Sequence, residues 1–181
     1  MSKKFGDKKS ILLALSVKKE TVVFAESCTA GAVSAEFAKT PGASEALLGS
    51  FVTYSPKMKR KLLGVKKKTI KKHTCESAEV VTEMALGALR VAKSNWAVAV
   101  VGHFGPDAPE EKDGMIWVAM AFRGNGTKSA TWIDVEYVEL EATGRVARCS
   151  ESVKHVLARF QHAAWVHDFA DWTCLSLKDK K

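Results

Sequence analysis

Residues 21–31 read TVVFAESCTAG, and this short stretch predicts a strand that turns into a helix. The apolar run TVVFA is typical of a strand that is buried on both faces of a sheet. Glu26 follows the run, and the small residues after Ser27 favour a helix. Ser27 is therefore either an ordinary cap or a nucleophile at the first turn of that helix, where backbone N–H groups are unpaired.

The rest of the chain alternates between strand and helix patterns. Further strands are predicted at 50–55, 96–102, 115–122 and 128–138, and helices at 5–18, 28–40, 77–93 and 144–165. This alternation predicts a three-layer α/β/α domain with a mostly parallel sheet. The last two strands predict a hairpin, which makes the sheet mixed. We expect one domain over residues 1–181, with 166–181 as a poorly patterned C-terminal tail.

The overall composition is that of a soluble globular protein. The chain has 181 residues, with 46% hydrophobic and 27% charged residues, and no apolar run long enough to span a bilayer. The basic N-terminus is interpreted as leading into a capped helix rather than as a signal peptide. The four cysteines lack C-x-x-C spacing, so we expect reduced thiols in a cytoplasmic protein and no metal site.

The net charge of +8 is concentrated in residues 55–73. A basic segment can bind nucleic acid, a membrane surface or an anionic small molecule. Aromatic residues do not interleave with this segment as they do on single-strand binding surfaces. A solvated basic face is therefore favoured, and we expect neither a nucleic-acid nor a membrane partner.

Three loops follow strands that are predicted to end at the same edge of the sheet. They are ESCTAG (26–31), TYSPKMK (53–59) and GHFGPDAP (102–109). Ligands bind at the carboxyl ends of strands in such sheets, so these loops are expected to form one site. A serine needs a base, and a desolvated Lys59, with Tyr54, fits better than a histidine triad. Taken singly, Tyr54 is more often a half-buried strand residue and Lys59 a solvated charge.

Several segments, in order, resemble the CinA C-terminal domain family of nicotinamide-nucleotide amidohydrolases. AESCTAG (25–31) resembles AESCTGG, and PGASEALLGSFVTYSPKMKRKLLGV (41–65) resembles PGAS…GFVTYSNEAK…LLGV. HTCESAEV (73–80) resembles HGAVSEEV, and VGHFGP (101–106) resembles TGIAGP. The resemblance covers residues 8 to 160.

The resemblance implies hydrolysis of the carboxamide of nicotinamide mononucleotide, without a metal, by a protein that is often a homodimer. We expect no cofactor. It implies Ser27 as nucleophile, with Tyr54 and Lys59 as its catalytic partners. Helix N–H groups near Thr29 and Ala30 are expected to stabilise the oxyanion. The remaining residues expected to bind substrate are Glu26, Cys28, Thr29, Ala30, Gly31, Gly102, His103, Phe104, Gly105 and Arg145.

The sequence departs from the family pattern around this site. The changed positions are Ala30, Val101, His103, Phe104 and Cys149, and the loop at 107–114 is shorter and lacks paired glycines. Arg145 is kept. A large Phe104 is expected to reshape or close the pocket. Two hypotheses follow. The chain is either an amidohydrolase, acting on nicotinamide mononucleotide or on a changed substrate, or a nucleotide-binding or regulatory relative with little or no turnover.

Overall fold

The computed structural model describes residues 8–105, 108–109, 112–126, 128, 130 and 132–178, with side chains described only from 9 to 165. The strands are β1 (Val22–Glu26), β2 (Leu47–Val52), β3 (Trp96–Gly102), β4 (Met115–Phe122) and β5 (Trp132–Glu139). The helices are α1 (Lys8–Lys18), α2 (Ala32–Ala38), α3 (Pro56–Leu63), α4 (Lys67–His73), α5 (Ala78–Ala92) and α6 (Arg145–Lys178), with a 3₁₀ turn η1 at Ala43–Glu45.

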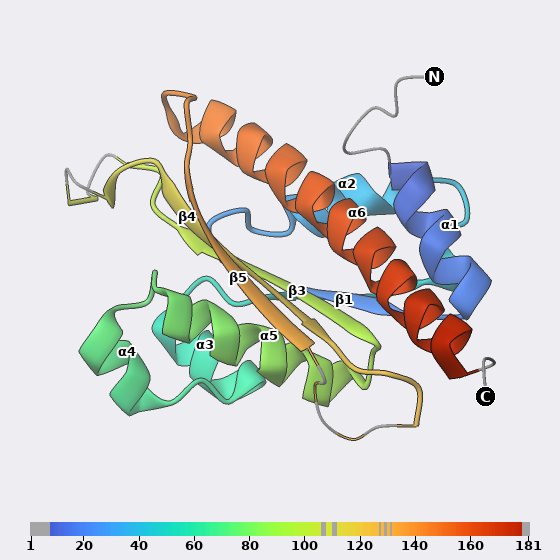
Figure 1. Cartoon of the computed structure of the whole chain (residues 1–181). Helices are drawn as coiled ribbons and strands as arrows, with labels where there is room; N and C mark the ends of the chain where they lie inside the picture. Colours follow the sequence, from blue (N-terminus) through green and yellow to red (C-terminus); the bar gives the residue numbers. More distant parts are fainter. Residues whose placement is uncertain are drawn as a thin grey trace.

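The five strands form one mixed sheet in the order β2-β1-β3-β4-β5 (Figure 1). β1 pairs in parallel with both β2 and β3, whereas β4 pairs antiparallel with β3 and with β5. Four strands therefore run in one direction and β4 runs against them. The predicted hairpin is confirmed, and it puts β5 at one edge of the sheet.

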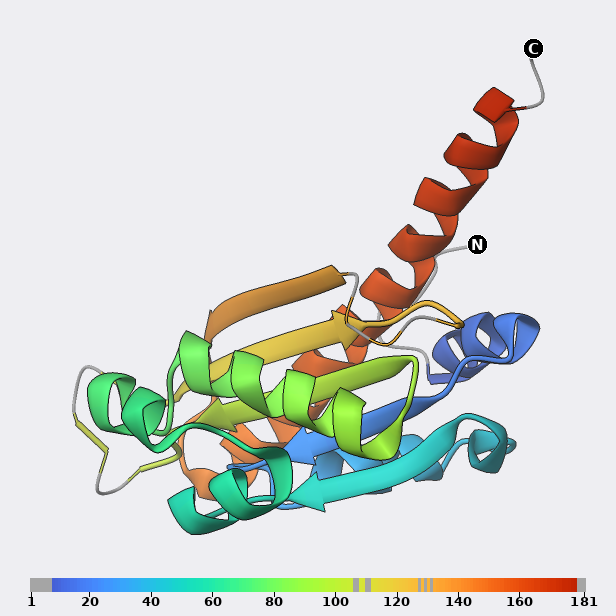
Figure 2. The same ribbon diagram turned by 90° about the horizontal axis from the view of Figure 1, so that it is seen from below.

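Helices cover both faces of the sheet, which confirms the predicted three layers. α1, α2 and α6 pack on one face, over a core that includes Phe24, Phe37 and Phe160. α5 covers the other face with α3 and α4 beside it, and its core includes Met84 and Leu89. Figure 2 shows α3, α4 and α5 on the near side of the sheet, and α1 on the other.

The central strands are buried because helices cover them on both sides. Every residue of β1 is buried, and so are the first six residues of β3. Trp96 at the start of β3 donates its indole N–H to a carboxylate oxygen of buried Glu20, 2.7 Å away. That hydrogen bond satisfies both polar groups inside the core.

Several element boundaries differ from those predicted. α2 begins at Ala32, not at residue 28, and β2 ends at Val52, so Tyr54 lies in a loop. α6 continues through residues 166–178, which the sequence pattern left unassigned. Within the part of the chain that is described, no helix is both long and apolar enough to cross a membrane.

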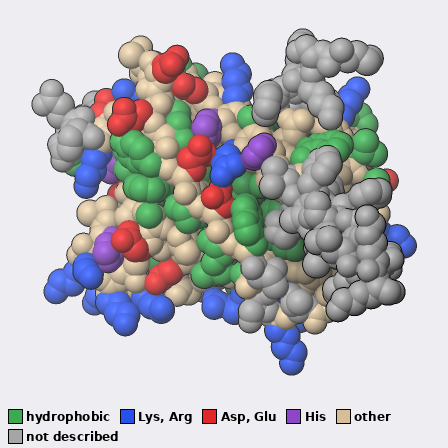
Figure 3. All heavy atoms as spheres, viewed as in Figure 1, with side chains coloured by type: hydrophobic (Ala, Val, Ile, Leu, Met, Phe, Trp, Pro, Cys, Tyr) green, Lys and Arg blue, Asp and Glu red, His purple; other side chains and the backbone are tan. Residues whose placement is uncertain are grey.

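The basic segment forms two short helices, α3 and α4. Its exposed cations are Lys57, Arg60, Lys61, Lys66, Lys67, Lys68, Lys71 and Lys72. Figure 3 shows Lys and Arg side chains gathered at the lower left, over α4. Lys59 alone among the basic residues of α3 is fully buried. The cations of this segment other than Lys59 are thus exposed, as expected for a basic face, and the absence of a nucleic-acid partner stays a prediction.

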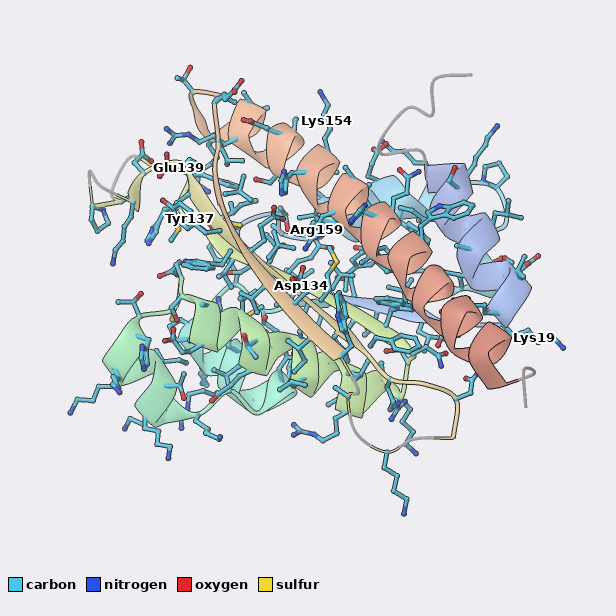
Figure 4. The ribbon with its side chains drawn as sticks, viewed as in Figure 1. Lys19, Asp134, Tyr137, Glu139, Lys154 and Arg159 are labelled. Carbon is cyan, nitrogen blue, oxygen red and sulfur yellow. The ribbon has the colours of Figure 1, made fainter. Side chains whose placement is uncertain are left out.

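A charged cluster joins β5 to α6. Arg159 of α6 contacts Asp134, and its Nε lies 3.2 Å from a carboxylate oxygen of Glu136. His155 Nε2 lies 3.1 Å from the same oxygen. Figure 4 shows Arg159 and Asp134 close together between the helix and the edge strand. The cluster helps to fix the first half of α6, from which Arg145 reaches the site described next.

Candidate active site

The turn between β1 and α2 is organised by Glu26, whose side chain is fully buried. Its carboxylate accepts hydrogen bonds from the hydroxyls of Thr29 and Ser50 and from the N–H groups of Gly31, Val33 and Ser34, at 2.8–3.1 Å. Glu26 thus satisfies the first free N–H groups of α2. The prediction that Ser27 sits at the first turn of this helix is wrong, because the chain makes another turn before α2 starts.

Ser27 instead faces a buried lysine. Its N–H donates to the carbonyl of Val100, which extends the pairing of β1 with β3 past Glu26. Lys59 Nζ lies 2.7 Å from Ser27 Oγ, and it also donates to the carbonyls of Thr53 (3.0 Å) and Tyr54 (3.4 Å). Ser55 caps α3 and Pro56 begins it, so Lys59 lies one turn into the helix and points toward the sheet.

The surroundings of Lys59 suit a neutral amine. Burial lowers its pKa below the ordinary value of 10.5, while nearby Cys75, Glu76 and Cys28 act weakly in the opposite direction. A neutral amine has two N–H groups and one lone pair. When the amine is neutral, the two carbonyls can accept both of its N–H groups, and the lone pair then faces the Ser27 hydroxyl; when it is protonated, the third N–H group donates to that hydroxyl. The neutral amine can remove the proton from Ser27.

Tyr54 takes part through its backbone rather than its phenol. The side chain is 56% exposed, and its hydroxyl accepts a hydrogen bond from Arg145 Nη1 at 3.2 Å. Arg145 Nη2 donates to the carbonyl of Gly105 at 3.0 Å. The start of α6 therefore ties together the loops after β2 and β3. Among the described contacts, the Tyr54 phenol touches neither Ser27 nor Lys59.

An open pocket of about 210 Å³ lies in front of Ser27. We call it the Ser27 pocket; its lining residues are Ser27, Cys28, Tyr54, Glu76, Gly102, His103, Phe104, Gly105, Ala108 and Arg145. Eight of these were predicted from the sequence. Glu76 and Ala108 were not, and Lys59 lies buried behind Ser27. The predicted residues Glu26, Thr29, Ala30 and Gly31 do not line the pocket, because they build the turn beneath it.

That turn also decides which N–H groups remain available. Ala30 and Gly31 have left-handed φ angles of 51° and 100°. The N–H of Ala30 already donates to the carbonyl of Ser27, and that of Gly31 to Glu26. The N–H groups of Cys28 and Thr29 hydrogen-bond to the Cys28 sulfur, and among the described residues they have no other partner. Ala30 is thus excluded as the predicted oxyanion donor in this conformation.

Glu76 and His103 face each other across the Ser27 pocket. His103 is held in place because its N–H donates to Met115 and its carbonyl accepts from Gly114. Its Nε2 lies 3.5 Å from a carboxylate oxygen of Glu76. Ser77 caps α5, which begins at Ala78, so Glu76 stands just outside that helix. No sequence signal indicated that the two side chains would meet.

The other departures from the family pattern have different consequences. Phe104 is only 4% exposed and packs into the core, and the pocket beside it stays open rather than closed. Val101 is buried in the core on the α5 side, away from the pocket. Cys149 Sγ lies 3.9 Å from the carbonyl of Thr29. Part of the shortened loop, residues 106, 107, 110 and 111, lies outside the described residues.

Cys28 is a poor competitor of Ser27 as a nucleophile. Burial raises the pKa of its thiol to about 12, although the N–H groups of Cys28 and Thr29 hydrogen-bond to the sulfur and act in the opposite direction. A thiol reacts as the thiolate, so Cys28 stays unreactive at neutral pH. The structure leaves Ser27 with a base in contact and Cys28 without one.

A serine paired with a buried lysine, at the carboxyl ends of parallel strands, places the chain among α/β proteins with a serine–lysine site. Residues 7–163 match the family model of the CinA C-terminal domain. The chain therefore belongs to the CinA C-terminal domain family.

Named relatives agree with this assignment. The nicotinamide-nucleotide amidohydrolase PncC of Shigella flexneri is 38% identical over 137 residues, which cover 74% of this chain and 81% of that protein. A CinA-like protein of Fervidobacterium nodosum is 46% identical over 113 residues, or 62% of this chain. The match spans only 28% of that longer relative.

A solved structure gives the same fold. The competence/damage inducible protein CihA from Agrobacterium tumefaciens superposes with a TM-score of 0.78 at 29% identity. The match covers 87% of this chain and 92% of that one. The predicted family and the mixed α/β fold are thus confirmed, whereas the roles of the individual site residues stay predictions.

Proposed function

We propose that this chain is an amidohydrolase that removes the carboxamide nitrogen of a nicotinamide nucleotide as ammonia, with Ser27 as nucleophile and Lys59 as base. The observation that carries the proposal is the 2.7 Å contact between Lys59 Nζ and Ser27 Oγ, both buried. The substrate class comes from the name of the PncC relative, of whose length the match spans 81%.

The first half-reaction forms an ester. The lone pair of Lys59 takes the Ser27 proton while Oγ attacks the carboxamide carbon. The N–H groups of Cys28 and Thr29 are the donors that we assign to the resulting oxyanion. Lys59 then returns the proton to the amide nitrogen, the C–N bond breaks, and ammonia leaves. Nicotinate mononucleotide is at this stage esterified to Ser27.

The second half-reaction hydrolyses that ester. A water molecule takes the place of ammonia and loses a proton to Lys59 as it attacks the ester carbon. The proton returns to Ser27 Oγ as the C–O bond breaks, which releases the carboxylate product. Lys59 thus serves as base and acid in turn, and the burial that lowers its pKa favours the neutral amine that the first step needs.

Arg145 is our candidate for the substrate phosphate. It lines the Ser27 pocket and is positioned by the carbonyl of Gly105 and the hydroxyl of Tyr54. Arginine binds phosphate with two parallel hydrogen bonds. Glu76 is the acidic side chain among the residues that line this pocket. We assign to it the cationic pyridinium ring, the other charge of the substrate.

The test is ammonia release from nicotinamide mononucleotide by the purified chain. Ser27→Ala and Lys59→Ala are expected to abolish release. Lys57→Ala is the matched control, because Lys57 is an exposed lysine on the same helix. It is expected to keep most of the activity.

No release by the wild type, with related nicotinamide nucleotides also tried, would reject the amidohydrolase. Nucleotide binding without turnover would then favour the alternative of a binding or regulatory relative. The expected homodimer and cytoplasmic location stay predictions. Sedimentation of the purified chain tests the homodimer.

A further inference from the structure

A second pocket lies at the end of the sheet opposite Ser27. It is formed where α5 ends, where β3 begins and where β4 leads toward β5, and it measures about 450 Å³. β3 has seven residues, so the two ends of this strand are about 20 Å apart. Its lining includes Arg90, Lys93, Arg123 and Lys128, and we call it the basic pocket.

The charge of the basic pocket differs from that of the Ser27 pocket. Four of its lining residues are cations, and none of those described is acidic. The Ser27 pocket, by contrast, balances Arg145 against Glu76. Four like charges around one concavity repel one another, and the repulsion is relieved when an anion binds between them.

Both arginines are oriented by the backbone. Arg90 Nη2 donates to the carbonyl of Leu63 at 3.2 Å and lies against Gly64, where an added Cβ would come within 2.8 Å of it. Arg123 Nη2 donates to the carbonyl of Ser94 at 2.9 Å. Neither guanidinium pairs with a carboxylate of the described residues. Most of their N–H groups thus remain free to bind a ligand.

Asn95 ties the walls of the basic pocket together. Its side-chain oxygen accepts from the N–H and the hydroxyl of Thr21, at 3.0 and 3.2 Å. Its amide nitrogen donates to the carbonyl of Arg123 (3.3 Å) and to the side-chain oxygen of Asn125 (2.8 Å). The oxygen of Asn125 is used by Asn95, and its NH₂ group has no hydrogen-bond partner among the described residues.

A structural role explains only half of these cations. Basic residues in the last turn of a helix offset the negative end of its dipole, and Arg90 and Lys93 stand at the end of α5. Arg123 and Lys128 come from the segment after β4 and have no such role. Their convergence on the same pocket indicates a shared anionic ligand.

We propose that the basic pocket binds a pyrophosphate group, either free or as part of a nucleoside triphosphate. Several charged donors and an amide match the many oxygens of linked phosphates. The volume exceeds that of the Ser27 pocket, so it accommodates more than one phosphate group. The proposal is independent of amide hydrolysis, because it uses no residue of the Ser27 pocket.

The test is calorimetric titration of the whole chain with inorganic pyrophosphate and, separately, with adenosine triphosphate, at two salt concentrations. The double variant Lys93→Gln/Lys128→Gln removes two exposed cations that hold no described hydrogen bond, so the fold is preserved. It is expected to weaken binding of both ligands at least about 10-fold. The matched control Lys71→Gln/Lys72→Gln removes the same charge from α4 and is expected to leave the affinity unchanged.

Four results would overturn the proposal. The first is that both double variants weaken ligand binding equally, and the second is that Arg145→Gln alone abolishes binding. The third is that duplex DNA binds more tightly than either ligand and that both double variants weaken this binding. The fourth is that neither ligand binds at millimolar concentration. The first indicates a diffuse charge effect, the second binding in the Ser27 pocket, and the third a nucleic-acid surface. Binding of adenosine triphosphate but not of free pyrophosphate identifies the nucleotide as the source of the group and supports the proposal.

Discussion

The two ends of the sheet use basic side chains in opposite ways. At the carboxyl end, Lys59 is fully buried against Ser27 and two carbonyls, and burial lowers its pKa. At the amino end, Lys93 and Lys128 are exposed to water and surround an open pocket. A cation that loses its hydration becomes a base, whereas one that keeps it remains a charge for binding anions. Burial, not residue type, separates the two roles that we propose.

The largest expected effect comes from fixing the charge of Lys59. Lys59→Arg keeps a cation that cannot lose its proton, so kcat/KM for nicotinamide mononucleotide is expected to fall by about 10³–10⁴. Lys59→Met serves as a second variant of similar length, and Lys57→Arg as the exposed control on the same helix. If Lys59→Arg keeps its activity, Lys59 is not the base, and the proposed difference between the two ends of the sheet is wrong.

The next effect tests how the turn holding Ser27 is supported. The carboxylate of Glu26 accepts five hydrogen bonds. In Glu26→Gln an NH₂ group replaces one of its oxygens, so that a donor faces the N–H and hydroxyl donors that this oxygen had bound. We expect the free energy of unfolding to fall by about 3 kcal/mol, measured in urea. Glu45→Gln, at an exposed site in η1, should change it by less than about 0.5 kcal/mol. Equal losses in the two variants would show that Glu26 is not the support.

A pH series tests the lowered pKa of Lys59 through its effect on the free energy of unfolding. Because the unfolded chain holds the Lys59 proton to higher pH than the folded one, the wild type gains stability as the pH rises toward 10.5. Lys59→Met lacks this gain. Urea unfolding at several pH values between 7 and 10 should show the wild type rising relative to the variant. Parallel curves would mean that the buried amine stays protonated.

A smaller effect is expected at Ala30, which the resemblance places where the family has glycine. Its φ of 51° is left-handed, a conformation that costs an alanine about 1 kcal/mol. Ala30→Gly removes this cost, but glycine also gains freedom in the unfolded chain, which offsets part of the benefit. The free energy of unfolding is therefore expected to rise by about 0.5 kcal/mol. Ala35→Gly, in the middle of α2, should instead lower it by about 1 kcal/mol. Denaturant titration of both variants decides.

The smallest effect tests whether the two ends act independently. Lys93→Gln/Lys128→Gln is expected to change kcat/KM for amide hydrolysis by less than about twofold, because additive behaviour is usual for sites so far apart. The assay contains no phosphate compound other than the substrate, so that no pyrophosphate occupies the basic pocket. A larger change would couple the basic pocket to the Ser27 pocket.

The sequence predicted the elements whose patterns are local. β1 and β3 are apolar runs, and α5 begins at a serine cap with an apolar stripe on one side, so periodicity and capping located all three. It also brought Ser27, Tyr54 and Lys59 together, because loops after parallel strands meet at one edge. It misplaced the start of α2 and the end of α6, since small residues and a mixed tail carry little periodicity.

The sequence by itself determined the layered fold, the family and the position of Ser27, because these depend on short-range patterns and on loop order. Only the tertiary structure decided what each polar group does. Glu26 became the support of a turn, the Tyr54 phenol turned to Arg145, and Glu76 met His103. The tertiary structure also showed that Lys59 is buried while the other basic residues of α3 are exposed. The physical reason is that burial and the partners of a charge depend on residues distant in the chain, which no local pattern records.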